Sequence, residues 1–290
     1  MSANPVQNFS RRNIPPLIKW PLIVVAVGYC VLMLILPLAV IFYEALAQGV
    51  LAYFKSFQDP AGQTAMLVTV VTTLVAVPLN MVFGIAAAWA IAKFDFPGKS
   101  LLITLIDLPF GISPIISGML FVMLFGSQSW LGPWLMERGI QIIFAWPGIL
   151  LTTIFVTFPY VARELIPLMQ EQGSDEEQAA ISLGANGWQT FWRITLPNIR
   201  WGLLYGVILC TARALGEFGA VAVVAANVRG KTNTITLHIE NLYNDYKIVA
   251  AFAMASVLAL AGMATLVIKS WIEHKLRPQH SPLELKTAEA

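Results

Sequence analysis

The chain has 290 residues, of which 57% are hydrophobic and only 12% are charged, about half the charged share of a soluble domain. Its apolar residues stand in long uncharged blocks and lack the periodicity that marks a single buried face. A net charge of +2 without a basic cluster gives no support for a nucleic-acid partner. The composition therefore argues against an ordinary soluble domain and predicts a protein whose apolar surface faces membrane lipid.

Six stretches of the sequence are long and apolar enough to cross a bilayer, which takes about 20 residues of helix. They are residues 20–42, 66–92, 101–125, 140–158, 201–226 and 248–268. The first follows Arg11, Arg12 and Lys19, as the apolar part of a signal peptide would. It is uncharged from Trp20 to Tyr43, however, and the apolar part of a signal peptide has only about 7 to 15 residues. We therefore expect an all-α, polytopic fold with about six membrane-spanning helices, and we expect the first helix to be retained.

The distribution of basic residues predicts the orientation, because Lys and Arg accumulate in cytoplasmic loops. With the N-terminus inside, twelve of the 18 basic residues fall in cytoplasmic segments, five fall outside, and Arg213 lies within a span. An even number of spans places both termini on the same side, so we expect both in the cytoplasm. The expected division is a cytoplasmic N-terminal segment, a transmembrane domain with one long cytoplasmic loop, and a cytoplasmic tail, at residues 1–19, 20–271 (loop about 159–200) and 272–290.

The connection between the fourth and fifth spans is much longer than the one between the second and third, and its residues favour helices. Ser174 and Glu177 have the S-x-x-E spacing of a capping box, and Gly184 stands where it would end the helix that follows. A second short helix is expected from Gly187 until Pro197 ends it. The loop is therefore predicted to contain two short cytoplasmic helices.

The first of these helices carries a recognisable pattern, Gln178-Ala179-Ala180 followed by Gly184. It resembles the cytoplasmic EAA loop of the permease subunits of bacterial ABC importers, in which a coupling helix docks into a cleft of the ATPase subunit. Small Ala179 and Ala180 permit the close approach that such docking needs. An ordinary amphipathic loop helix is the alternative. The resemblance assigns ATPase coupling to four residues: Gln178, Ala179, Ala180 and Gly184.

One residue departs from the family pattern. Gln178 stands where the family has glutamate, and Glu177 comes immediately before it. A neutral amide makes a weaker hydrogen bond to a cationic partner than a carboxylate does. Any charge-assisted contact of this position with an ATPase arginine is therefore weakened, whereas the docking role of the helix is unaffected.

The fifth predicted span contains two charged residues, Arg213 and Glu217. Arg213 follows Trp201 by 12 residues, which places it about 18 Å along the helix, near the middle of a hydrocarbon core about 30 Å thick. Inserting a charge there costs about 2.5–3.5 kcal/mol, so we expect the pair to face away from lipid and to neutralise itself at i, i+4. Two roles stay open: a salt bridge that fixes helix packing, and a charge pair that lines the pathway or the subunit interface.

The third predicted span is interrupted by prolines and glycines. Pro109, Gly111, Pro114 and Gly118 do not favour a continuous helix, and interrupted spans of transporters expose backbone groups to a substrate or a cavity. Asp107 adds a further charge, which either faces the interior or reaches interfacial water. Together with the two charges of the fifth span, the candidate pathway or interface residues are Asp107, Pro109 and Pro114.

The sequence shows no catalytic or metal-binding pattern. The three histidines, His238, His274 and His280, lack the spacing of metal ligands. Gly98-Lys99-Ser100 ends like a phosphate-binding loop, but the position five residues before Gly98 is Lys93 and not glycine. We therefore expect neither an enzyme nor a cofactor bound by this chain.

Nearly the whole chain, from about residue 20 to 275, is similar to the CysW-type permease subunits of bacterial sulfate/thiosulfate ABC transporters. The segments that carry the similarity are Asn80–Gly84, Asp107–Gly118, Arg163–Pro167, Gly184–Trp201, Arg213–Val221 and Arg229–Thr232. The resemblance implies a type I ABC importer permease fold in the bacterial inner membrane, transporting sulfate or thiosulfate by alternating access. It also implies three kinds of protein partner: a related CysT-type permease, two CysA-type ATPase subunits that use ATP and Mg, and a periplasmic sulfate/thiosulfate-binding protein.

Two other functions stay open at this point. A molybdate or tungstate permease would carry an oxyanion of the same charge and similar shape. A stand-alone anion channel or secondary transporter would use Arg213 for anion passage, and copurification of an ATPase distinguishes it from an importer subunit. The preference between sulfate and thiosulfate, and the pairing of this chain with itself or with a relative, are also open.

Overall fold

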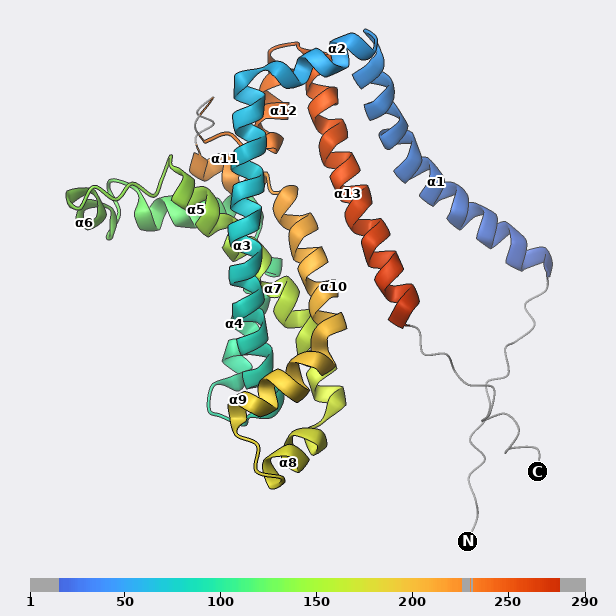
Figure 1. Cartoon of the computed structure of the whole chain (residues 1–290). Helices are drawn as coiled ribbons and strands as arrows, with labels where there is room; N and C mark the ends of the chain where they lie inside the picture. Colours follow the sequence, from blue (N-terminus) through green and yellow to red (C-terminus); the bar gives the residue numbers. More distant parts are fainter. Residues whose placement is uncertain (1–15, 226–229, 231, 277–290) are drawn as a thin grey trace.

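The computed structural model describes residues 16–225, 230 and 232–276, and every regular element within these ranges is a helix (Figure 1). The predicted all-α class is therefore confirmed. Among the described residues, four helices are long and apolar enough to cross a membrane, and two bent helix pairs raise the number to six. The four are α1 (Pro16–Leu46), α3 (Pro60–Lys93), α7 (Trp146–Gln172) and α13 (Ile248–Leu276).

The predicted terminal segments lie only partly within the described residues. Residues 16–19 already belong to α1, and residues 1–15 lie outside the description. Residues 272–276 continue α13, so the helix extends past the expected start of the tail at residue 272. The remainder of the tail, from residue 277, also lies outside the described part of the chain.

The third predicted span is broken, as its prolines and glycines indicated. It consists of α4 (Lys99–Gly111) and α5 (Pro114–Phe125), which meet at 110°. Pro114 lacks the N–H that would continue the hydrogen bonds of α4, and it holds Ser113 in an extended conformation with φ −58° and ψ 136°. The break therefore follows from the local chemistry of Pro114.

The fifth span is a longer helix than expected. It runs from Gly187 to Leu215 through α9 (Gly187–Thr190), a π-helical segment (Phe191–Thr195) and α10 (Leu196–Leu215), and it bends by 50° into α11 (Gly219–Ala225). The prediction that Pro197 ends a short helix is wrong. Pro197 lies in the first turn of α10, directly after the wider π turn, where its missing N–H is tolerated.

The fourth span also differs from its predicted limits. Helix α7 begins at Trp146 rather than near residue 140, and it continues to Gln172 rather than ending near Phe158. Pro159 and Pro167 lie inside it. The loop therefore begins at Gly173, where φ is +64°, and residues 159–172 belong to the helix. Buried side chains of this stretch pack between α3 and α10, which offsets the cost of the two prolines.

The core of the bundle is the contact of α3, α7 and α10. A Cβ atom built on Gly84 of α3 would lie 2.6 Å from the Cγ1 atom of Val161 of α7, so the missing side chain permits the close approach of these helices. Asn80 lies at the same contact, and its Nδ2 atom donates to the Oγ1 atom of Thr157 at 2.7 Å. A buried polar group within an apolar bundle needs such a partner.

Helix α1 stands apart from this bundle. It contacts α13 and α2 (Val50–Lys55), and every residue from Lys19 to Pro37 is exposed. Figure 1 shows it diverging from the bundle toward the end of the molecule where α8 (Asp175–Ser182) lies. The remaining elements are a 3₁₀ turn (Ser56–Gln58), α6 (Gly132–Glu137), α8 (Asp175–Ser182) and α12 (Ile235–Asn244).

Candidate functional site: a coupling helix and a charged helix break

Helix α8 ends where the sequence predicted. Gly184 has φ +90°, and around it the N–H of Gly184 bonds to the carbonyl of Ile181 at 2.9 Å while that of Ala185 bonds to the carbonyl of Ala180 at 3.0 Å. These bonds satisfy carbonyl groups at the helix end. L side chains are strained in the left-handed region. The backbone conformation therefore favours glycine at position 184, in addition to the small size that close docking of a partner needs.

The predicted capping box at the start of α8 does not form. Ser174 is the N-cap residue, but its side chain makes no cap hydrogen bond, and its Oγ atom instead accepts from the Nε2 atom of Gln178 at 2.7 Å. The box in this loop is at the start of α9, where Asn186 and Gln189 each accept the other's backbone N–H, at 2.8 and 3.0 Å. The S-x-x-E prediction is therefore wrong, because Glu177 has a different partner.

That partner is Lys93, the last residue of α3. The Nζ atom of Lys93 lies 3.1 Å from the Oε2 atom of Glu177, and it also donates to the carbonyl oxygen of Gly173. The other carboxylate oxygen of Glu177 accepts from the Oγ1 atom of Thr195 at 2.6 Å. The inner side of α8 is thus bound to two spans, and local spacing rules could not have found this contact.

The residues that the sequence pattern assigned to coupling lie together on the outer side of α8. Gln178, Ala179 and Gly184 are exposed, and Ala180 is half-buried. Apolar side chains adjoin them: Leu183 is 89% exposed, and Ile181 and Trp188 are also exposed. An apolar surface on a helix that carries three acidic residues in its first turn is typical of a protein contact.

Arg213 and Glu217 form the predicted i, i+4 pair at the end of α10. The Nη1 atom of Arg213 lies 2.5 Å from the Oε2 atom of Glu217, as an ion pair whose geometry is not that of a hydrogen bond. The carboxylate is buried, with 2% of the Glu217 side chain exposed, against 28% for Arg213. Its Oε1 atom accepts the N–H of Ala220 at 3.0 Å, and the backbone carbonyl of Glu217 accepts the Oγ1 atom of Thr236 at 2.7 Å.

The broken third span packs against this charged break. A Cβ atom on Gly118 of α5 would lie 2.6 Å from the carbonyl oxygen of Ala220, and one on Gly219 would lie 3.1 Å from the Cβ atom of Pro114. Helices α5 and α11 therefore cross closely through their glycines. The structure places Pro114 beside the helix that Glu217 caps.

The other candidates of the third span lie at a different contact. Asp107 of α4 pairs with Arg163 of α7, with its Oδ1 atom 3.2 Å from the Nε atom, and both side chains are about half exposed. The guanidinium of Arg163 also lies 5.0 Å from the ring centre of Phe110. Pro109 is buried within α4. Asp107 thus belongs to the contact of α4 with α7, whereas Pro114 belongs to that of α5 with α11.

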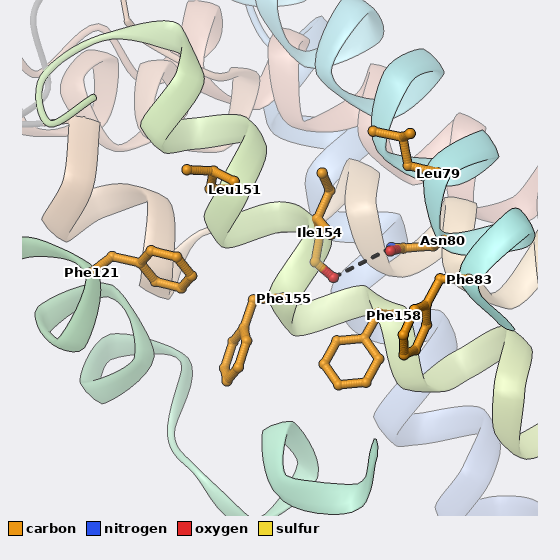
Figure 2. A pocket seen from close by; sticks show the side chains of 8 residues that line it. All are labelled: Leu79, Asn80, Phe83, Phe121, Leu151, Ile154, Phe155 and Phe158. Carbon is orange, nitrogen blue, oxygen red and sulfur yellow. Dashed lines mark hydrogen bonds between the residues drawn. The ribbon is translucent and has the colours of Figure 1, made fainter. Parts of the chain in front are cut away.

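A cavity of about 470 Å³ lies between α3, α5 and α7 (Figure 2). Its lining residues are Leu79, Asn80, Phe83, Phe121, Leu151, Ile154, Phe155 and Phe158. The amide nitrogen of Asn80 is already used, since it donates to Thr157 and to the carbonyl of Ile154. A lining without a charged residue does not suit an oxyanion. The sequence did not indicate this aromatic cavity.

Within the described ranges, no group of three or more His, Cys, Asp and Glu side chains is placed to hold a metal ion.

Comparison with known proteins decides the family. Residues 80–278 match the family model described as "Binding-protein-dependent transport system inner membrane component". The chain belongs to this family.

The relatives support the same assignment over most of the chain. It is 50% identical over 258 residues to the "Sulfate transport system permease protein CysW" of Synechocystis sp., covering 89% of this chain and 94% of that protein. It is 48% identical to the protein of the same name from Escherichia coli K12, covering 90% of each chain. It is 35% identical to the "Sulfate transport system permease protein CysT" of that bacterium, covering 81% of this chain and 85% of that protein.

The fold is shared with a solved importer. A bacterial ABC transporter that imports the acidic polysaccharide alginate contains a chain that matches with a TM-score of 0.73 at 17% identity, covering 93% of this chain and 98% of that one. This likeness concerns the fold. Together with the relatives, it makes the chain a membrane-spanning permease subunit of an ABC importer and not an enzyme. A stand-alone channel or secondary transporter is not favoured.

Proposed function

We propose that this chain is one of two permease subunits that form the membrane pathway of an ATP-driven sulfate importer. The observation that carries the proposal is 50% identity over nearly the whole chain to a permease named for sulfate transport. The weaker match to a second sulfate permease, CysT, supports pairing with a related subunit rather than with a second copy. Thiosulfate, with the same charge and a similar shape, is the further substrate that we propose.

The proposed partners follow from the family and from the exposed surfaces of the chain. A binding-protein-dependent permease receives its substrate from a periplasmic binding protein, here one for sulfate and thiosulfate. Two CysA-type ATPase subunits would supply ATP hydrolysis with Mg, and no cofactor is assigned to this chain. The apolar surface of α1, exposed from Lys19 to Pro37, would be covered by lipid and by the CysT-type permease.

The proposed contact with the ATPase is the outer side of α8, at Gln178, Ala179, Ala180 and Gly184. Exposure of this side, small residues at the centre of it and the adjacent apolar Leu183 support the proposal. On this basis we propose that α8 and both chain termini lie in the cytoplasm and that the spans lie in the inner membrane. Movement of α8 with the ATPase would then switch the spans between inward-facing and outward-facing states.

For the charged break we propose a packing role for Glu217 and a pathway or interface role for Arg213. Glu217 is buried and holds the start of α11 through Ala220, so its carboxylate is not available to a substrate. Arg213 is partly exposed, and a dianion that crosses a low-dielectric region needs a positive group or oriented dipoles nearby. Pro114, which lies against α11, is proposed to keep this wall of the pathway in place, while Asp107 and Pro109 are proposed to belong to an interface.

The test is ATP-dependent uptake of radiolabelled sulfate into proteoliposomes that contain this chain with its sister permease, ATPase and binding protein. We expect uptake that needs both ATP and the binding protein, and competition by thiosulfate. Stronger competition by molybdate or tungstate than by thiosulfate would assign the chain to those oxyanions instead. Uptake without the ATPase would indicate a channel or secondary transporter.

A further inference from the structure

Lys93 is a cation almost enclosed by protein at the end of α3. Only 8% of its side chain is exposed, although it lies at the end of a helix where a lysine normally extends into water. Its ammonium group has two acceptors, the carboxylate of Glu177 and the carbonyl of Gly173. Both acceptors precede or lie in the first turn of α8, so a single side chain attaches the whole start of α8 to α3.

A second set of contacts attaches the same turn to the start of α10. The Nδ2 atom of Asn198 donates to the Oε2 atom of Glu176 at 2.5 Å, and the buried Thr195 donates to Glu177. The carbonyl of Asn198 accepts from the Nε2 atom of Gln172 at 3.1 Å. Helix α8 is therefore held between the ends of two spans by its first turn.

The outer side of α8 has no such attachment to the spans. The side-chain hydrogen bonds of Gln178 and Ser182 stay within α8 and its cap. The first turn of α8 thus binds the bundle, whereas the outer side of α8 is exposed. A force applied to the outer side of α8 therefore reaches the spans through this first turn.

We propose that Lys93 is a positioning residue for energy coupling, locking α8 to α3 so that both move as one body when the ATPase moves α8. The inference rests on the proposed docking of α8 to an ATPase. An enclosed ion pair is screened by water much less than a surface pair, so it resists displacement. Helix α3 is in turn packed tightly on α7 at Gly84 and Val161, which carries the movement into the bundle.

The first experiment uses the assembled importer and measures sulfate transported per ATP hydrolysed. Lys93→Met and Glu177→Gln are made singly and together, because the double variant leaves no unpaired enclosed charge. We expect the double variant to retain the ATPase and to hydrolyse ATP, with the transport ratio lowered by about fivefold or more. Lys93→Arg, which keeps the charge, should keep most of the ratio. An unchanged ratio in the double variant would overturn the proposal.

A matched control pair lies six residues away. Lys99 and Asp95 form an i, i+4 pair at 2.9 Å, with the Asp95 side chain fully exposed. The double variant Asp95→Asn with Lys99→Met removes the same charges at the same end of α3, and its ratio should stay within about twofold of the parent. A loss equal to that of the Lys93 variant would show that local charge, and not attachment of α8, sets the ratio.

The second experiment needs neither a Lys93 variant that assembles nor measurable transport. Spin labels at Ala86→Cys on α3 and Ser182→Cys on α8, both exposed positions, are placed in a complex whose exposed Cys30 is replaced by alanine. We expect one distance that is the same without nucleotide and with ATP bound. A distance that changes on ATP binding would show a hinge between α8 and α3 and overturn the proposal. Failure of sulfate uptake in the parent complex would count against the proposed substrate and not against this attachment.

Discussion

The Oε1 atom of Glu217, which lies in the break between α10 and α11, accepts the backbone N–H of Ala220 in the first turn of α11 at 3.0 Å. The other oxygen of the same carboxylate neutralises Arg213. Two functions therefore meet on one side chain, the capping of a short helix and the compensation of a charge within a span. Because the two use different atoms and different chemistry, substitutions at Glu217 separate them.

We expect Glu217→Gln to be less harmful than Glu217→Ala. The glutamine retains an acceptor for the N–H of Ala220, whereas alanine removes it, and loss of such a cap costs about 1 kcal/mol. Both variants leave Arg213 without its counter-ion, a loss of about 3–5 kcal/mol for an enclosed pair. Membrane abundance and the thermal unfolding midpoint of the purified complex measure these effects. Equal loss in the two variants would show that the cap adds nothing.

The double variant Arg213→Leu with Glu217→Gln distinguishes the roles of the charge pair. It leaves no unpaired charge in the span, so we expect abundance to recover relative to Glu217→Gln alone. If Arg213 lines the pathway, sulfate uptake stays low although abundance recovers. Recovery of both would make the pair purely structural, and strictly additive effects on both readouts would mean that the two residues do not interact.

Substitution of Gly118 should disturb the crossing of α5 and α11. A Cβ atom at this position would lie 2.6 Å from the carbonyl oxygen of Ala220 and 3.0 Å from the Cβ atom of Val223. Gly118→Ala is therefore expected to destabilise the protein by about 1–3 kcal/mol. The control is Gly262→Ala on α13, where no neighbour lies within 4 Å, and which should be neutral or stabilising by about 0.5–1 kcal/mol. Similar unfolding midpoints for the two variants would contradict the close crossing.

A bulky residue at Ala179 should weaken the contact with the ATPase. Ala179→Leu enlarges an exposed position at the centre of the proposed docking surface, and overpacking of a fitted contact costs about 1–3 kcal/mol. Copurification of the ATPase and sulfate uptake should both fall, while the chain stays in the membrane. Ala47→Leu, an exposed alanine in the connection between α1 and α2, is the control. Full retention of the ATPase by Ala179→Leu would refute the assignment of this surface.

Restoring the carboxylate of the family pattern should be tolerated. Gln178 is exposed, and its side chain donates a hydrogen bond to Ser174 within the loop, whose hydroxyl can donate to a glutamate in its place. Gln178→Glu is expected to bind the ATPase at least as tightly, since charge-assisted hydrogen bonds are about twice as strong as neutral ones. Titration of the ATPase against the purified permease pair measures the affinity. Weaker binding would show that the facing surface of the ATPase is not basic.

Features that depend on one or two turns of chain were predictable from the sequence. The lengths of the apolar stretches determine the membrane-spanning class, because the bilayer thickness sets how many residues a helix needs. Pro114 breaks the third span and Gly184 ends α8 through backbone restrictions that act on immediate neighbours. Arg213 and Glu217 meet because they are four residues apart, and the turn that follows Leu215 keeps Glu217 close to the end of α10.

Features that depend on how the helices pack were decided only by the tertiary structure. Pro159 and Pro167 stay within α7 because burial against α3 and α10 outweighs a local penalty, so the loop begins later than expected. The capping box predicted at Ser174 fails because Glu177 binds Lys93 instead. Lys93 and the carbonyl of Gly173 are 80 residues apart in sequence, and a contact at that separation forms only when the folded chain brings the ends of its spans together.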